Sequence, residues 1–106
     1  MAKYLLIGSY TAEGARGALQ EGGTRRRQAA EQSIQSAGGT LESLYWAFGE
    51  DDFYAISDFP NTESAVAAAM TLGGSGAVKV RTVVLITAAD LDAASKRSVT
   101  YRAPGT

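Results

Sequence analysis

The sequence predicts a single α+β domain in which four strands and two main helices follow the order β-α-β-β-α-β. Three observations lead to this prediction. Period-2 apolar runs on both sides of the acidic turn at residues 49–52 indicate a central β-hairpin. A segment with helical spacing lies on each side of the hairpin, and a run of strand-forming residues lies near each end of the domain.

The first half of the chain predicts one strand and one helix. Residues 3–10 are rich in strand formers. Residues 11–23 contain four glycines and are expected to form a loop, with room for one helical turn at 15–19. Thr24 is a suitable N-cap for a helix that ends at Gly38 and Gly39. The buried stripe of this helix is expected to consist of small residues: Ala29, Ala30, Ser33, Ile34 and Ala37.

The second half predicts three strands and two helices. Strands are expected over 41–48, 53–59 and 77–87. Asn61 or Thr62 caps the second main helix, whose buried side is expected to comprise Val66, Ala69, Met70 and Gly73. A short helix over 88–94 follows, capped by Thr87, and residues 96–106 form a polar tail outside the domain of residues 1–95.

This order of elements is that of the ferredoxin-like sandwich, a four-stranded antiparallel sheet with helices on one face only. Leu44, Trp46 and Phe48 alternate with Leu41, Tyr45 and Ala47, so the strands look apolar on both faces. A sheet with one wet face should alternate apolar with polar residues. We therefore expect a second copy of the chain to cover the open face, giving a homodimer (or higher homo-oligomer) with a dimeric α/β barrel.

Composition excludes several kinds of site. The chain has neither cysteine nor histidine, which excludes disulfides, thiolate metal sites and the commonest general base. Ten basic and eleven acidic residues give a net charge of −1, so neither nucleic acid nor a membrane is an expected partner. The N-terminal apolar run is too short for a signal peptide, which favours a cytoplasmic protein. No cofactor and no metal are expected.

Five segments, taken in order along the chain, together resemble the GYD domain family. They comprise residues 13–17, 38–42, the hairpin at Gly49, residues 58–61 and residues 77–83. The resemblance covers about residues 2–95. It implies a small bacterial protein with a dimeric α/β-barrel fold, from a family to which no function is assigned. The family is named after Gly-Tyr-Asp in the hairpin turn; here Gly49 and Asp52 match, whereas Glu50 and Asp51 stand where the tyrosine is expected.

The hairpin and the Arg81-Thr82 pair are also similar to the effector-binding domain of leucine-responsive-type regulators. That resemblance implies the same fold used for a small ligand. No helix-turn-helix segment is expected in front of the domain.

Five residues are candidates for ligand binding, and each also has a structural interpretation. Arg16 could hold a carboxylate or phosphate, or it could order its loop through an ion pair. Tyr10 and Trp46 could line a pocket between subunits, or they could pack in the core or the dimer interface. Asp58 and Arg81 could form a catalytic carboxylate with an anion-holding arginine, or a buried structural ion pair within or across subunits.

Two further clusters of charge are expected to be solvated. Arg25, Arg26 and Arg27 form a basic first turn of the first helix, answered by nearby acidic residues. The acidic turn at residues 50–52 lacks the spacing of a calcium loop and is expected to be a solvated turn.

Two functions of different classes fit these observations. The first is a non-enzymatic homo-oligomeric module that binds a small organic ligand. The second is a small cofactor-free oxygenase or isomerase of the dimeric α/β-barrel type, in which tyrosine, aspartate and arginine would do the acid–base work. A purely architectural role in a larger assembly is a third reading that the sequence does not separate from the first.

Overall fold

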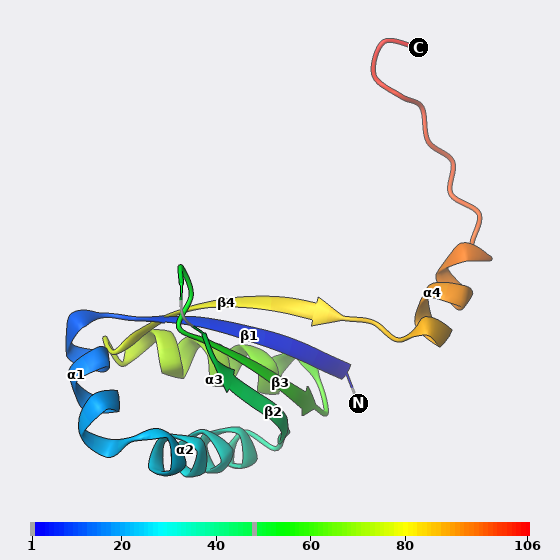
Figure 1. Cartoon of the computed structure of the whole chain (residues 1–106). Coiled ribbons are helices and arrows are strands. Elements are labelled where there is room, and N and C mark those ends of the chain that lie inside the picture. Colours follow the sequence, from blue (N-terminus) through cyan, green and yellow to red (C-terminus); the bar gives the residue numbers. More distant parts are fainter. Residues whose placement is uncertain (1, 48) are drawn as a thin grey trace.

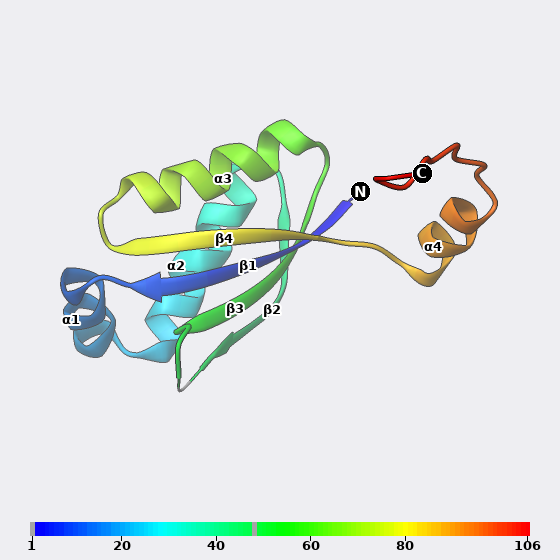
Figure 2. The ribbon, with the colours of Figure 1, turned by 90° about the horizontal axis from the view of Figure 1, so that it is seen from above.

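The computed structural model describes residues 2–47 and 49–106 and contains the predicted elements with one additional helix. Their order along the chain is β1 (Ala2–Tyr10), α1 (Ala12–Glu21), α2 (Gly23–Ser36), β2 (Thr40–Trp46), β3 (Phe53–Phe59), α3 (Thr62–Gly74), β4 (Val78–Leu85) and α4 (Ala88–Ser95). The strands form one antiparallel sheet in the order β2-β3-β1-β4. Helices α2 and α3 lie against one face of this sheet, as Figures 1 and 2 show. The α+β ferredoxin-like prediction is therefore confirmed.

The core lies between the sheet and these two helices. On β1, Tyr4 and Leu6 point toward the helices and are almost fully buried. The ring of Tyr4 meets the ring of Phe59 edge-on, with centroids 5.6 Å apart. The other members of the buried cluster come from α2, α3 and the two central hairpin strands: Ile34, Leu41, Ala55, Ala65 and Ala68.

The segment predicted as a loop, residues 11–23, instead contains helix α1. Thr11 caps it, its hydroxyl oxygen accepting the Gly14 N–H at 3.2 Å. Thr11 is itself tied to the start of β4, because its N–H donates to the Ala77 carbonyl at 3.0 Å. A side chain at Gly14 would lie 1.9 Å from that same carbonyl oxygen. Glycine at position 14 lowers the helix propensity of this segment. It also permits close packing against Ala77, and this packing outweighs the low propensity.

The start of helix α2 differs from the prediction, whereas its end agrees with it. The helix begins at Gly23, one residue before the expected cap Thr24, after a Gly22 with φ of 79°. Its end at the glycine pair is as predicted. Gly38 has φ of 88°, and the N–H groups of Gly38 and Gly39 donate to the carbonyls of Gln35 and Ile34.

The predicted buried side of α3 is wrong for Val66, Met70 and Gly73, whereas Ala69 does pack partly buried against the core. Ala65 and Ala68 are buried, whereas Val66 and Met70 are 46% and 72% exposed. After its first turn this helix has one polar residue, Thr71, so the spacing of apolar residues does not single out one face. The small alanines let the helix backbone approach the sheet closely. Asn61 caps the helix, accepting the Ser64 N–H at 2.9 Å.

The predicted assignment of β2 residues to the two faces of the sheet is also wrong. The register between β2 and β3 shifts between Leu41 and Ser43, which marks a β-bulge. Because of the bulge, Leu41, Leu44 and Trp46 all lie opposite residues of β3 that face the helices. Phe48, predicted at the end of this strand, lies outside the described residues.

The C-terminal segment extends away from the sheet and its helices (Figure 1). Helix α4 has the predicted Thr87 cap, completed by Asp90 into a capping box, yet none of its residues is buried. Residues 96–106 are exposed throughout. The radius of gyration is 16.8 Å, against about 13 Å for a compact chain of this length. Over residues 2–47 and 49–106, no helix has both the length and the apolar character needed to cross a bilayer.

Gly8 is required by the way Phe53 packs across β1. The two residues face each other in the sheet, and a Cβ atom at Gly8 would lie 2.0 Å from the Phe53 ring. We expect Gly8→Ala to lower the free energy of unfolding by about 1–3 kcal/mol, because the ring must move. Urea denaturation measures this change. Gly17→Ala, where nothing lies within 4 Å, should be neutral or stabilising; equal losses in both variants would contradict this packing.

Candidate functional site

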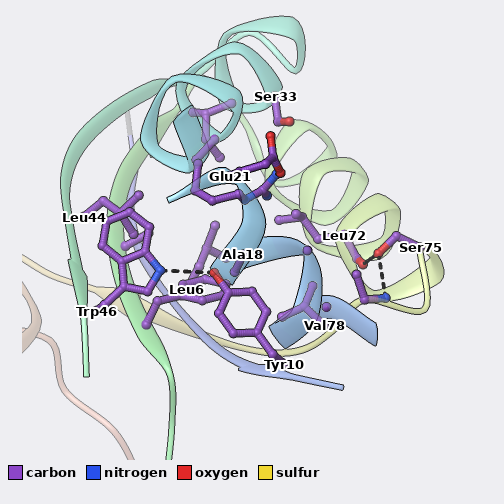
Figure 3. A pocket seen from close by; sticks show the side chains of 18 of the residues that line it. Leu6, Tyr10, Ala18, Glu21, Ser33, Leu44, Trp46, Leu72, Ser75 and Val78 are labelled. Atoms are coloured by element: carbon purple, nitrogen blue, oxygen red, sulfur yellow. Dashed lines mark hydrogen bonds and ion pairs between the residues drawn. The ribbon is translucent and has the colours of Figure 1, made fainter. Parts of the chain in front are cut away.

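A hollow lies between the sheet and helices α1 and α2. It has a volume of about 290 Å³. This is roughly twice the volume of an engineered apolar cavity that binds benzene. Its floor is formed by sheet residues that point toward the helices, among them Leu6, Leu44 and Val78 (Figure 3). A second hollow of about 470 Å³ shares Tyr10, Ala18, Arg26 and Trp46 with it, so the two adjoin each other.

Helix α1 leaves space for this cavity because its inner face carries small residues. Gly14, Gly17 and Ala18 recur at helical spacing and all line the cavity. Glu13 and Glu21 lie on the same face, before and after these small residues. The helix that the sequence did not predict thus contributes one wall of the site.

Three aromatic side chains form the wall opposite. The rings of Tyr10 and Phe53 have centroids 5.5 Å apart, and Trp46 lies beside Phe53 in the register of β2 and β3. The Trp46 indole N–H donates to the Tyr10 hydroxyl oxygen at 3.1 Å, as the dashed line in Figure 3 shows. This bond fixes two of the three rings relative to each other. We call Tyr10, Trp46 and Phe53 the aromatic wall.

The aromatic wall depends on Asp52 in the hairpin turn. The Asp52 carboxylate accepts the Tyr10 backbone N–H at 2.7 Å, and the Asp52 N–H donates to the Gly8 carbonyl at 2.8 Å. The Asp52 carbonyl accepts the Ala47 N–H at 2.8 Å, one residue after Trp46. One residue therefore joins the ends of β1 and β2 beside the cavity.

The acidic turn is thus not simply solvated, as the sequence had suggested. Asp51 is also engaged, accepting hydrogen bonds from Ser9 at 3.2 Å and Tyr54 at 3.3 Å, and an ion pair from Arg81 at 2.9 Å. Glu50 alone of the three is fully exposed. In the part of the chain that the structure describes, no group of three or more acidic residues is placed to hold a metal ion.

The five predicted binding residues do not meet in one place. Tyr10 and Trp46 line the cavity, but on the helix side of the sheet, whereas the sequence suggested the side between subunits. Arg16 is exposed and does not line either hollow.

Asp58 and Arg81 lie on the open face and do not pair with each other within the chain, whereas a pair across subunits stays a prediction. Arg81 pairs with Asp51, and Asp58 pairs with Lys3, directly opposite it in the sheet, at 3.2 Å. Glu42 also binds the Lys3 ammonium, at 3.0 Å. The hydrogen bond to the Glu42 carboxylate is the largest cause of a raised pKa of Lys3, and the hydrogen bond to Asp58 acts in the same direction. Each charge thus finds a nearer partner, because strand order places β1 between β3 and β4.

Glu21 and Arg26 line the cavity, although the sequence did not predict either of them as a binding residue. Their side chains form an ion pair at 3.1 Å between the end of α1 and the start of α2. The basic run 25–27 was expected to be solvated and answered by acidic neighbours, and Glu21 is one of these. The sequence does not indicate that this pair borders a cavity, because its glycine-rich residues 11–23 predict a loop where the structure has α1.

Comparison with known proteins gives a family and a fold. The family model described as GYD domain matches residues 4–95. Among solved structures, the crystal structure of MtbAldR superposes with a TM-score of 0.56 at 18% identity, over 81% of this chain and 52% of that chain. This chain therefore spans about half the length of that protein. No curated protein matches the sequence.

Removing the Asp52 carboxylate should loosen the aromatic wall. We expect Asp52→Ala to lower the free energy of unfolding by about 1.5–3 kcal/mol, because a charge-assisted hydrogen bond to Tyr10 is lost. Emission of Trp46, the single tryptophan, should shift as well. Chemical denaturation and fluorescence spectra measure the two effects. The matched control is Glu50→Ala in the same turn; if it has the same effect, Asp52 has no special role.

Proposed function

The chain belongs to the GYD domain family, and we propose that this member is a non-enzymatic homo-oligomeric module that binds a small organic ligand in the cavity beneath α1. The observation that carries this proposal is the cavity itself. It is concave, lined mainly by apolar and aromatic side chains, and bordered by a few polar groups, which is the usual composition of a small-molecule site.

The bonding of three polar groups of the lining supports binding rather than catalysis, although Glu13 forms no ion pair within the described chain. Glu21 is paired with Arg26, and the Tyr10 hydroxyl oxygen accepts the Trp46 N–H. Groups that are already bonded to each other are positioned to orient a ligand. A general acid or base would need to reach a reacting atom of the substrate at hydrogen-bond distance.

The open face of the sheet supports self-association. Strand residues pointing away from the helices include Leu5, Ile7, Ile56, Val83 and Leu85. Val83 is 40% exposed. A contiguous apolar strip of this kind on a sheet face is typical of a protein interface. The C-terminal segment adds Leu91, Val99 and Tyr101, all exposed by more than half.

Binding in the cavity can be tested with neutral probes. We expect toluene and 2-phenylethanol to shift the amide NMR signals of residues lining the cavity, such as Gly17 and Ala18. Ala18→Phe should abolish these shifts, because the added ring occupies the space. Ala94→Phe on α4 is the matched control and should bind like the unmodified chain. Shifts that persist in Ala18→Phe would place binding elsewhere.

Self-association through the open face can be tested with one charge. We expect Val83→Asp to shift the chain toward monomer by about tenfold or more in dissociation constant, because an aspartate would be desolvated in the interface. Sedimentation equilibrium measures this. Val66→Asp is the control, since Val66 is similarly exposed but lies on α3. A wild-type chain that is monomeric at micromolar concentration would refute self-association.

A further inference from the structure

We propose that the cavity selects a small organic cation, an amine with an apolar body, over neutral and anionic molecules of the same shape. This inference rests on the proposed ligand-binding function and names the chemical class of the ligand. It follows from the charges and the aromatic rings that line the cavity.

The lining carries an excess of negative charge. Its charged side chains are Glu13, Glu21 and Arg26, two carboxylates against one guanidinium. Arg26 is already paired with Glu21, and Glu13 forms no ion pair with any other described residue. Within the described chain, Glu13 is therefore the lining carboxylate that remains to receive a cation.

Backbone dipoles do not reverse this balance. Helix α1 ends at Glu21 and α2 begins at Gly23, so a negative and a positive helix end meet beside the cavity and offset each other. The positive N-terminus of α1 lies at Glu13, in its first turn, and with about half an elementary charge it offsets part of that carboxylate's charge but does not cancel it. The sign of the field inside the cavity is set mainly by the side chains.

The aromatic wall favours a cation for an independent reason. Aromatic faces carry negative charge density and attract ammonium groups, at exposed sites as well as at desolvated ones. This site is partly open to water, because Trp46 is 41% exposed and Glu13 and Glu21 are exposed. Tyr10, Trp46 and Phe53 stand together on the sheet side of the cavity, held by the Trp46–Tyr10 hydrogen bond. Across the cavity, α1 presents Glu13 and Glu21 with the small residues Gly17 and Ala18 between them.

The arrangement also limits the ligand's size. Glu13 and Glu21 are eight residues apart on one helix, a rise of about 12 Å. A cavity of about 290 Å³ between them accepts one ring with a short side chain. An ammonium at the end of that side chain would lie among the carboxylates and rings while the apolar body contacts the floor formed by Leu6 and Leu44.

The test compares three probes of nearly equal shape on the unmodified chain: 2-phenylethylammonium, 2-phenylethanol and 3-phenylpropionate. Trp46 fluorescence and amide NMR shifts report binding. We expect the ammonium to bind about tenfold more tightly than the alcohol, and the carboxylate to bind most weakly. The preference for the ammonium should decrease at high salt.

Glu13→Gln should lower affinity for the ammonium severalfold and leave affinity for the alcohol unchanged. Glu63→Gln on α3, an exposed acidic residue outside the cavity, is the control and should change neither. Thermal melting of both variants checks that they fold.

The outcomes separate this inference from the function on which it rests. Equal binding of all three probes, or tighter binding of the carboxylate, overturns the preference for cations and leaves the ligand-binding function standing. An unchanged ammonium affinity in Glu13→Gln also overturns it. If none of the probes binds at millimolar concentration, both the preference and the cavity's role as a ligand site are overturned.

Discussion

The hydrogen bonds of Asp52 are the constraint on which the site depends. A hairpin at the edge of a small sheet would ordinarily be free to splay away from the neighbouring strand. Here the Asp52 carboxylate and N–H bind the backbone of Tyr10 and Gly8, at 2.7 and 2.8 Å, and its carbonyl accepts the Ala47 N–H. These contacts fix the ends of β1 and β2 where the aromatic wall stands.

The cavity follows from this constraint together with two glycine positions. Gly8 lets the Phe53 ring lie across β1, and Gly14 lets α1 pack against the start of β4. The helix then spans the end of the sheet with small residues on its inner face. Rigid aromatic groups on one side and small residues on the other leave a space that side chains do not fill.

The fold could be read from the sequence because it is set by local patterns. Two period-2 runs around an acidic turn, caps such as Asn61 and Thr87, and the Gly38–Gly39 helix end are signals that neighbouring residues carry. Of the site, the sequence singled out Tyr10 and Trp46, but the rest could not be predicted from local patterns. Helix α1 forms because Thr11 and Gly14 contact Ala77, more than sixty residues away in the chain. The partners of Asp58 and Arg81 follow from strand order, and the face of β2 that carries Trp46 follows from a bulge.

The most direct test of the account is a map of contacts between a bound probe and the side chains of the protein. Intermolecular nuclear Overhauser effects from the ring protons of 2-phenylethanol would supply it. We expect contacts to the rings of Trp46 and Phe53 and to the methyl groups of Leu6 and Leu44. Contacts only to methyl groups of the open face, such as those of Ile56 and Val83, would contradict it.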